Sequence, residues 1–396
     1  YDLSVSAINR QQAQLLKTQQ QISASRRVLT PSDDPIASSR ALEITQADSI
    51  NTQYGANAQT ATGRLSLTEQ MLGRVTDVLQ SIRQNAIAAG NGGFTASDRE
   101  TVAQDIQAMY DEVMTVANTT DGEGNYLFSG FQTDLKPFSP TAAGVQYLGD
   151  DGQRLVQVAS GRQIAVSESG ADVFMRIRRG NATFAVSAPP ANTGNATYSK
   201  GTVSDPSAIT RHQYQIVFSV VGTTTTYDVL DVSAGTTVAA AQPYTSGAAI
   251  AFDGISLEVS GAPAAGDLVQ IDPSTDQDLF KTISDLIAAL KGPAGDTAAL
   301  ARLQNALTDA LINLDQDLDN VSSVRAGVGT RMRETDNHQL ASEDLSLQYK
   351  QVLSHLQDLD YAKAVSDLLQ QQTNLQAAQK TLCKWRNCRY STICEA

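Results

Sequence analysis

The stretch that decides the fold is residues 8–35, INRQQAQLLKTQQQISASRRVLTPSDDP. Four apolar residues in it stand seven positions apart, namely Ile8, Leu15, Ile22 and Leu29. A seven-residue repeat puts such side chains in one stripe along a helix, and glutamine fills many of the positions between the first three. A helix with so narrow an apolar face is marginal alone in water, so this one needs a partner.

The same stretch ends in a linker with two prolines and two aspartates: Thr30, Pro31, Asp33, Asp34 and Pro35. Proline interrupts a helix, and an aspartate side chain accepts hydrogen bonds from the free amides at the start of the next helix. The linker therefore predicts that one helix stops here and another begins. We interpret the two aspartates as helix caps rather than as paired catalytic carboxylates.

Two further helices are predicted on either side of a glycine-rich turn at 90–93. The first carries two rows of residues at seven-residue spacing, Leu65, Leu72 and Leu79 beside Thr68, Val75 and Ile82. The second carries apolar residues at spacings of four and three, from Val102 to Val116, and Ser97 with Glu100 matches a capping box at its start. We expect the two helices to pack as a long antiparallel hairpin.

Helical periodicity is absent from about residue 121 to residue 273. Gly, Thr, Val and Ser dominate there in short alternating runs, such as 214–220 followed by Gly222, which predicts a β-rich insertion. The helical pattern returns at Asp276, where Leu307, Leu314 and Val321 repeat every seven residues, and it continues to Leu382.

These patterns predict an α+β multidomain protein, with a long antiparallel helical bundle or coiled coil from both chain ends and an inserted β-rich region. We divide the chain into an N-terminal assembly helix at 1–40, a helical hairpin plus β-hairpin region at 41–175, a variable β-rich outer domain at 176–272, a returning helix of the helical domain at 273–335, and a C-terminal assembly helix with an atypical tail at 336–396.

No catalytic or metal-binding set emerges from the sequence. The three histidines lie far apart, at His212, His338 and His355, and no nucleophile elbow, P-loop or dinucleotide fingerprint occurs. Asp315, Asp317 and Asp319 alternate within a helical segment; because alternate residues do not share a helix face, we interpret them as a solvated polar face. We therefore expect no enzyme activity, no cofactor and no metal.

The charge balance and hydropathy also exclude some partners. A net charge of −13 argues against nucleic acid, which needs clustered Lys and Arg for its phosphates. No run approaches the roughly 20 apolar residues that cross a bilayer, so no membrane partner is expected.

Residues 11–22 and 27–35 resemble the N-terminal signature of the flagellin superfamily, and within it are most similar to the hook-associated proteins of the hook–filament junction. Residues 125–130 (NYLFSG) and 147–152 (YLGDDG) are similar to the same family, as is the C-terminal run from 360 to 380. The resemblance covers roughly 1–165 and 275–382.

The resemblance implies a secreted structural subunit that joins hook to filament in the bacterial flagellum. It also implies export in an unfolded state through the flagellar type III apparatus, with a cytoplasmic export chaperone. Outside the cell the subunits would self-associate in a ring, between the first hook-associated protein and filament flagellin, with their terminal helices paired as a coiled coil. We expect the assembly interface to comprise Ile8, Leu15, Ile22, Leu29, Thr30, Pro31, Asp33, Asp34, Pro35, Val365, Leu368 and Leu375.

Both chain ends depart from the family pattern. Tyr1 stands about ten residues inside the family's usual start, so we expect that N-terminal sequence is missing. All three cysteines and the single tryptophan fall within 383–396, where the family has an apolar helical end. We interpret this tail as the product of a shifted reading frame, which sequencing of the coding DNA around Leu382 would test.

Two other functions fit the residues. Filament flagellin shares the terminal pattern, and the place of the labelled protein, as a band at the hook tip or along the filament, discriminates between them. A cell-surface adhesin or glycan-binding protein would use the Thr- and Ser-rich β region, and glycan-array binding by a 176–272 fragment would support it.

Overall fold

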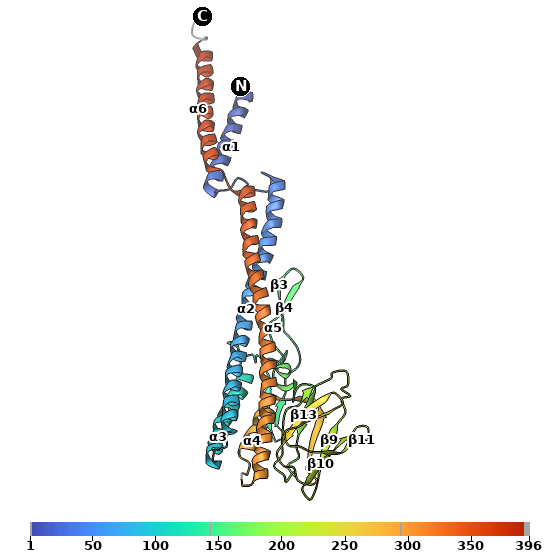
Figure 1. The fold of residues 1–396 in the computed structure, drawn as a ribbon. Coiled ribbons are helices and arrows are strands. Elements are labelled where there is room, and N and C mark those ends of the chain that lie inside the picture. The colour runs from blue at the N-terminus through green and yellow to red at the C-terminus, as the bar shows by residue number, and fades with distance from the viewer. Residues whose placement is uncertain (1, 143, 294, 392–396) are drawn as a thin grey trace. The chain divides into compact units, whose positions relative to one another are not determined.

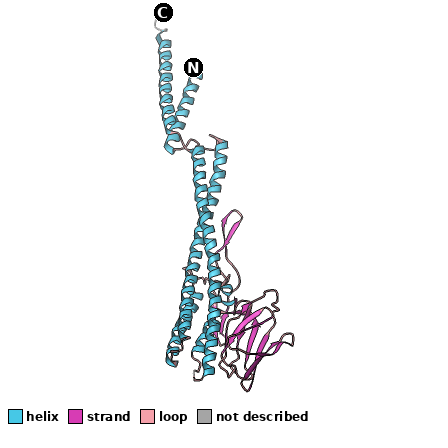
Figure 2. Cartoon of the chain, viewed as in Figure 1, coloured by secondary structure: helices cyan, strands magenta, loops and turns pink. Residues whose placement is uncertain are grey.

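The computed structural model describes residues 2–142, 144–293 and 295–391, with side chains from residue 6 to residue 381 within those ranges. Long helices lie at both ends of the chain and a strand-rich region lies between them, which confirms the predicted α+β organisation (Figure 2). The helices are α1 (Asp2–Ala24), α2 (Pro35–Ala89), α3 (Ala96–Ala117), α4 (Leu279–Leu290), α5 (Thr297–Gln357) and α6 (Tyr361–Ser391).

The strands form several small sheets and two larger ones. They are β1 (Phe138–Thr141), β2 (Gly144–Tyr147), β3 (Leu155–Ala159), β4 (Arg162–Ala165), β5 (Ile177–Arg178), β6 (Phe184–Ser187), β7 (Thr197–Tyr198), β8 (Thr202–Val203), β9 (Tyr214–Val221), β10 (Thr224–Asp231), β11 (Thr236–Pro243), β12 (Ala249–Phe252), β13 (Ile255–Ser260), β14 (Leu268–Pro273) and β15 (Asp276–Gln277). A short π-helix, η1 (Ala171–Met175), precedes β5.

The chain divides into two compact units. One comprises Tyr1–Gln59, Val158–Gly161 and Asp336–Ala396, and we call it the terminal unit. The other comprises Thr60–Gln157 and Arg162–Thr335, and we call it the central unit. The helices α2 and α5 contribute residues to both.

In the terminal unit, α1 packs against α6, and the first part of α2 packs against the last part of α5 (Figure 1). The Nδ2 of Asn51 donates to the carbonyl of Ser342 over 2.7 Å, and the Ser342 hydroxyl donates back to the Asn51 carbonyl over 2.9 Å. The backbones approach closely here, because a Cβ on Gly55 would lie 3.0 Å from the Ser342 Oγ. Glycine therefore fits this crossing better than a larger residue.

The predicted hairpin is present in the central unit, where α2 and α3 run antiparallel. Arg74 on α2 pairs with Glu112 on α3 over 2.9 Å, and Leu65, Leu72 and Leu79 are all buried. The predicted capping box is two residues out of register. Thr95, not Ser97, caps α3, with Asp98 rather than Glu100 as its reciprocal partner. The turn closes sooner than predicted because Phe94 already donates to the Asn91 carbonyl.

Aromatic rings fill the space between the helices and the loops that follow α3. Phe174, on η1, is fully buried, and its ring centroid lies 5.3 Å from those of both Phe128 and Phe138. Phe280 of α4 lies 6.0 Å from it on the other side. These rings join the segment after α3, β1, η1 and α4 into one core.

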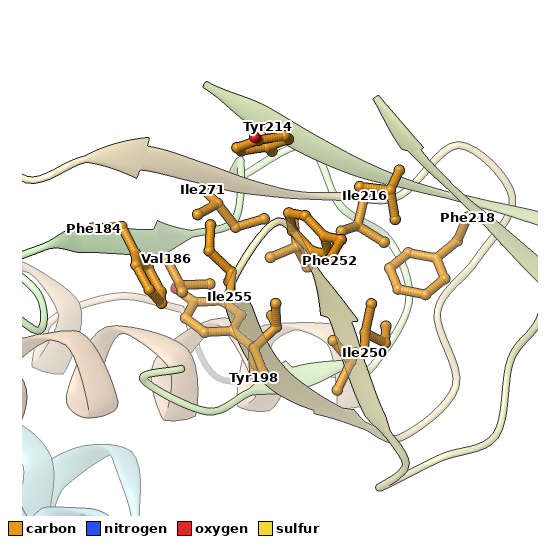
Figure 3. Close-up of a cluster of buried hydrophobic side chains, with 14 residues drawn as sticks. Phe184, Val186, Tyr198, Tyr214, Ile216, Phe218, Ile250, Phe252, Ile255 and Ile271 are labelled. Carbon is orange, nitrogen blue, oxygen red and sulfur yellow. The ribbon is translucent and has the colours of Figure 1, made fainter. Parts of the chain in front are cut away.

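Residues 184–273 form a two-layer β sandwich. One sheet has the order β11-β10-β9-β14-β6, and the other has β12-β13-β7, with β8 also paired to β13. Inward side chains of the two sheets meet in one apolar cluster (Figure 3), which includes Ile216 and Ile271 from the first sheet and Ile250 and Phe252 from the second. Face-to-face packing of alternating side chains is the usual way in which two sheets share a core.

The interpretation of Asp315, Asp317 and Asp319 as a solvated face is wrong for the middle residue. The Asp317 side chain is 1% exposed, and its Oδ2 has no hydrogen-bond partner. It stands three residues after Leu314 and four before Val321, so it lies on the apolar face of α5 and is covered with it. This burial raises the pKa of Asp317 well above its ordinary value.

Candidate functional site

The candidate site is the antiparallel pair of α1 and α6. Ile8, Leu15 and Ile22 on α1 are each only half-buried, and so are Leu368 and Leu375 on α6. Among the described side chains of the two helices, just two small ones are buried: Thr18 and Ala364. The pair therefore has almost no apolar core of its own.

Two of the predicted apolar interface residues do not lie among the half-buried residues of α1 and α6. Leu29 is half-buried in the linker rather than on a helix, because α1 ends at Ala24 and Ser25 adopts a left-handed backbone with φ of 57°. Val365 is 44% exposed, so it does not join the half-buried residues of α6.

The linker after α1 is fastened to the end of α5 and to the linker that leads into α6. Arg27 carries most of the contacts: its backbone N–H donates to the Gln357 carbonyl over 2.7 Å, its Nη2 donates to the Leu356 carbonyl over 2.8 Å, and its Nη1 lies 3.1 Å from the Asp34 Oδ2. Beside it, Arg26 and Asp358 form an antiparallel β-bridge. The chain segment that leaves α1 and the one that enters α6 therefore lie side by side.

The interpretation of both linker aspartates as helix caps is wrong for Asp33, whose carboxylate contacts the linker and Lys17 rather than the start of α2. The Oδ2 of Asp33 accepts from the amides of Leu29 and Thr30, and its Oδ1 lies 2.7 Å from the Lys17 ammonium. These contacts, with that to Lys17 the strongest, lower the pKa of Asp33 to about 2. Asp34 accepts from the Ala37 amide at the start of α2, so it caps that helix as predicted.

Replacing Lys17 with methionine is expected to raise the pKa of Asp33 toward its ordinary value of about 4, because the ammonium favours the charged carboxylate. A carboxyl whose pKa is lowered by folding stabilises the fold above its ordinary pKa, and that contribution disappears as the pH falls through about 2 in the wild type. NMR titration of carboxyl-labelled aspartate measures the shift directly. The matched control is Lys350→Met, at an exposed position of α5, which should leave the pKa of Asp33 unchanged.

Sequence reasoning missed a second set of apolar side chains in the terminal unit. They lie on α1, α2, α5 and α6, were assigned no function from the sequence, and are at least 40% exposed: Leu16, Ile36, Leu42, Ile50, Leu340, Leu347, Val352 and Leu369. Leu340 and Leu347 stand seven residues apart, but the eight residues as a set follow no single repeat. These side chains add exposed apolar surface to all four helices of the terminal unit.

Nothing in the described part of the chain gathers three or more His, Cys, Asp or Glu side chains into a metal site. Within the same residues, no helix is both long and apolar enough to span a bilayer. What the site can offer is packing area and hydrogen bonds. The atypical tail 383–396 cannot be placed against α1, because its side chains lie outside the described residues.

Comparisons with known proteins match this chain to flagellar proteins. Residues 4–133 match the family model of the bacterial flagellin N-terminal helical region, and residues 188–273 match that of the D2-like domain of flagellar hook-associated protein 1. Flagellar hook-associated protein 3 of Salmonella typhimurium is 29% identical, over 96% of this chain and 93% of its own length.

Two solved structures are similar throughout their length. Flagellar hook-associated protein 3 of Legionella pneumophila is 30% identical with a TM-score of 0.75, and the match covers 79% of this chain and 98% of that one. FlgL of Xanthomonas campestris is 30% identical with a TM-score of 0.73, covering 78% of this chain and 99% of that one. The chain belongs to the hook-associated protein 3 family.

As a member of the hook-associated protein 3 family, the chain is a structural subunit of the bacterial flagellum at the hook–filament junction. This confirms the resemblance predicted from residues 11–35 and favours it over a filament flagellin. The relatives are structural flagellar proteins, and association with other flagellar components follows from membership.

Proposed function

We propose that the terminal unit forms the mechanical joint, by packing alone and without a reaction or a cofactor. The observation that carries this proposal is that the α1–α6 pair buries just Thr18 and Ala364 among its described side chains. Ile8, Leu15 and Ile22 keep part of their apolar surface for a neighbour. Burial of that surface between copies is worth about 25 cal/mol per Å², so a lattice of subunits gains what the monomer lacks.

The partners that we propose are those that membership of the family implies. Copies of the chain self-associate in a ring, the first hook-associated protein lies on the hook side, and filament flagellin adds on the other. The match of residues 188–273 to a domain of hook-associated protein 1 supports a shared architecture on the two sides of the joint. Before export, a cytoplasmic chaperone would cover the apolar side of the C-terminal helix, where Leu368 and Leu375 lie.

The linkers transmit load through the joint. Arg27 holds the end of α5, at Leu356 and Gln357, together with Asp34 before α2, so we expect the linker after α1 to limit the independent movement of α1. Linker residues Thr30 to Pro35 therefore act as a positioning element rather than as a binding loop. The five-segment division at residues 40, 175, 272 and 335 stays a prediction that limited proteolysis of the purified monomer would test.

Fluorescent labelling of the full chain in a flagellated cell tests the assigned position. We expect one band at the tip of each hook, also in cells that lack filament flagellin. The band should vanish in cells that lack the first hook-associated protein, and the chain should then appear in the medium. Label distributed along the filament would contradict the proposal and restore the flagellin alternative.

A further inference from the structure

One face of α5 holds the β sandwich through polar side chains. Four of them stand at spacings of three, four and four, which places them on one side of the helix; we call them the polar ladder: Arg302, Asn305, Asp309 and Asn313. Asp309 accepts from the Tyr198 hydroxyl over 2.7 Å, and the Oδ1 of Asn305 accepts from the backbone amide of the same tyrosine over 3.2 Å.

The other contacts of the polar ladder reach backbone atoms of the sandwich and of its connecting segment. The Nδ2 of Asn305 donates to the Ala196 carbonyl over 3.1 Å, and the Nη1 of Arg302 donates to the Asn192 carbonyl over 3.0 Å. The Oδ1 of Asn313 accepts from the Gly180 amide over 2.8 Å. The ladder thus holds the strand-rich region at several points along α5.

The sandwich does not depend on α5 for its apolar core. Every residue of its central cluster comes from 184–271, and α5 contributes none of them (Figure 3). Tyr198 belongs to both structures, since its ring packs in the cluster while its hydroxyl reaches Asp309. A domain with a closed core and polar attachments can move without unfolding.

Two cavities flank Asp309, and it lines both. The smaller is about 180 Å³ and the larger about 410 Å³. Both cavities are open to solvent, so water can lie beside the polar ladder on two sides of Asp309.

We propose that the polar ladder is a latch that holds the β sandwich on α5 while Asp309 is protonated and loosens when Asp309 ionises. In the closed state the carboxyl lies between α5 and the sandwich with only part of its surface exposed, where an uncharged group costs less than a charged one. In the open state water reaches it and solvates the charge.

The environment of Asp309 sets the pH at which the latch responds. Burial raises the pKa of Asp309 to about 7, against the opposing effects of the Tyr198 hydrogen bond and the positive charge of Arg179. Arg179 is itself 3.6 Å from Asp272, so part of its charge is already neutralised. Lys200 and Asp285 line the smaller cavity together with Arg179 and Asp309.

On the other side, Arg302 and Asp267 line the larger cavity with Asp309. Asp267 already accepts from the amides of Thr193, Gly194 and Ala264. Because closure raises the pKa of Asp309, the closed state is favoured at low pH and loses this advantage as the pH rises through about 7. A return of the pKa from about 7 to about 4 on opening corresponds to an effect of up to about 10³-fold on the equilibrium.

Hydrogen exchange of the full chain, corrected for the intrinsic rate, measures the opening. The amides of Tyr198 and Gly180 report on it, because both donate to ladder side chains. The amide of Phe218 is the internal reference, since it donates to the backbone carbonyl of Asp267 inside the sandwich. Between pH 5 and pH 8 we expect the first two to lose protection by at least about tenfold while Phe218 keeps its own.

Three variants test whether ionisation of Asp309 opens the latch. Asp309→Asn keeps the shape but cannot ionise, so its exchange should lose the pH dependence; a wild-type slope would overturn the proposal. Tyr198→Phe keeps the ring in the core and removes the hydroxyl, so it should expose the Gly180 amide already at pH 5; wild-type protection there would also overturn it. Asp319→Asn, exposed on the same helix, is the matched control and should behave as wild type.

Discussion

Replacement of Phe174 with alanine should destabilise the central unit by about 3–5 kcal/mol, the range for removing a large aromatic side chain from a packed core. Phe174 is fully buried and touches rings from three other segments, at Phe128, Phe138 and Phe280. The surroundings cannot collapse easily into the space. Gly170 beside it is already so crowded that a Cβ there would lie 2.5 Å from the Phe128 carbonyl oxygen.

Urea unfolding, followed through the exchange of amides in α3, measures this loss in the helical part of the central unit separately from the sandwich. The matched control is Phe131→Ala, since Phe131 is 65% exposed and its loss should cost less than about 1 kcal/mol. Equal stability losses in the two variants would show that the aromatic cluster does not hold the central unit together.

The helical part of the fold could be predicted because its information is local. Leu65, Leu72 and Leu79 repeat within one helix, and that repeat fixes the buried side without knowledge of the partner. The ends of helices depend on turn geometry as well as on local sequence. Thr95 with Asp98 and Ser97 with Glu100 both match a capping box, and the turn geometry selects between them.

The burial of Asp317 shows where pattern reasoning stopped short. The alternating aspartates suggested a solvated face, although position 317 fits the spacing of Leu314 and Val321 and so belongs to the covered side. The polar ladder was beyond prediction for another reason. Asp309 and Tyr198 are 111 residues apart, and only the folded chain brings them together.

The site was predicted in part. Ile8, Leu15 and Ile22 lie half-buried on one helix, but the seven-residue repeat also included Leu29, which the end of α1 at Ala24 removes from the helix. The repeat gave no indication of Arg27, because two of its three contacts are with carbonyls more than 300 residues away. The assignment of Ile8, Leu15 and Ile22 to assembly stays a proposal.

The largest functional effect should come from the triple change Ile8→Gln, Leu15→Gln and Ile22→Gln. Glutamine is a good helix former and already dominates α1, so the helix itself is preserved. Each change removes an apolar side chain that we expect neighbouring copies to finish burying, at a cost of about 1 kcal/mol or more. Three such losses in every subunit should weaken assembly by at least about 100-fold.

In cells whose own gene for this protein is deleted, the triple variant should therefore restore neither filaments nor swimming, while the protein still appears in the medium. Its appearance there separates failed assembly from failed export. The matched control changes three exposed positions of the same helix, Gln12→Ala, Gln19→Ala and Ser23→Ala, and should restore swimming. If the triple variant swims as well as the control, the half-buried stripe does not hold the joint, because its apolar surface is then dispensable between subunits.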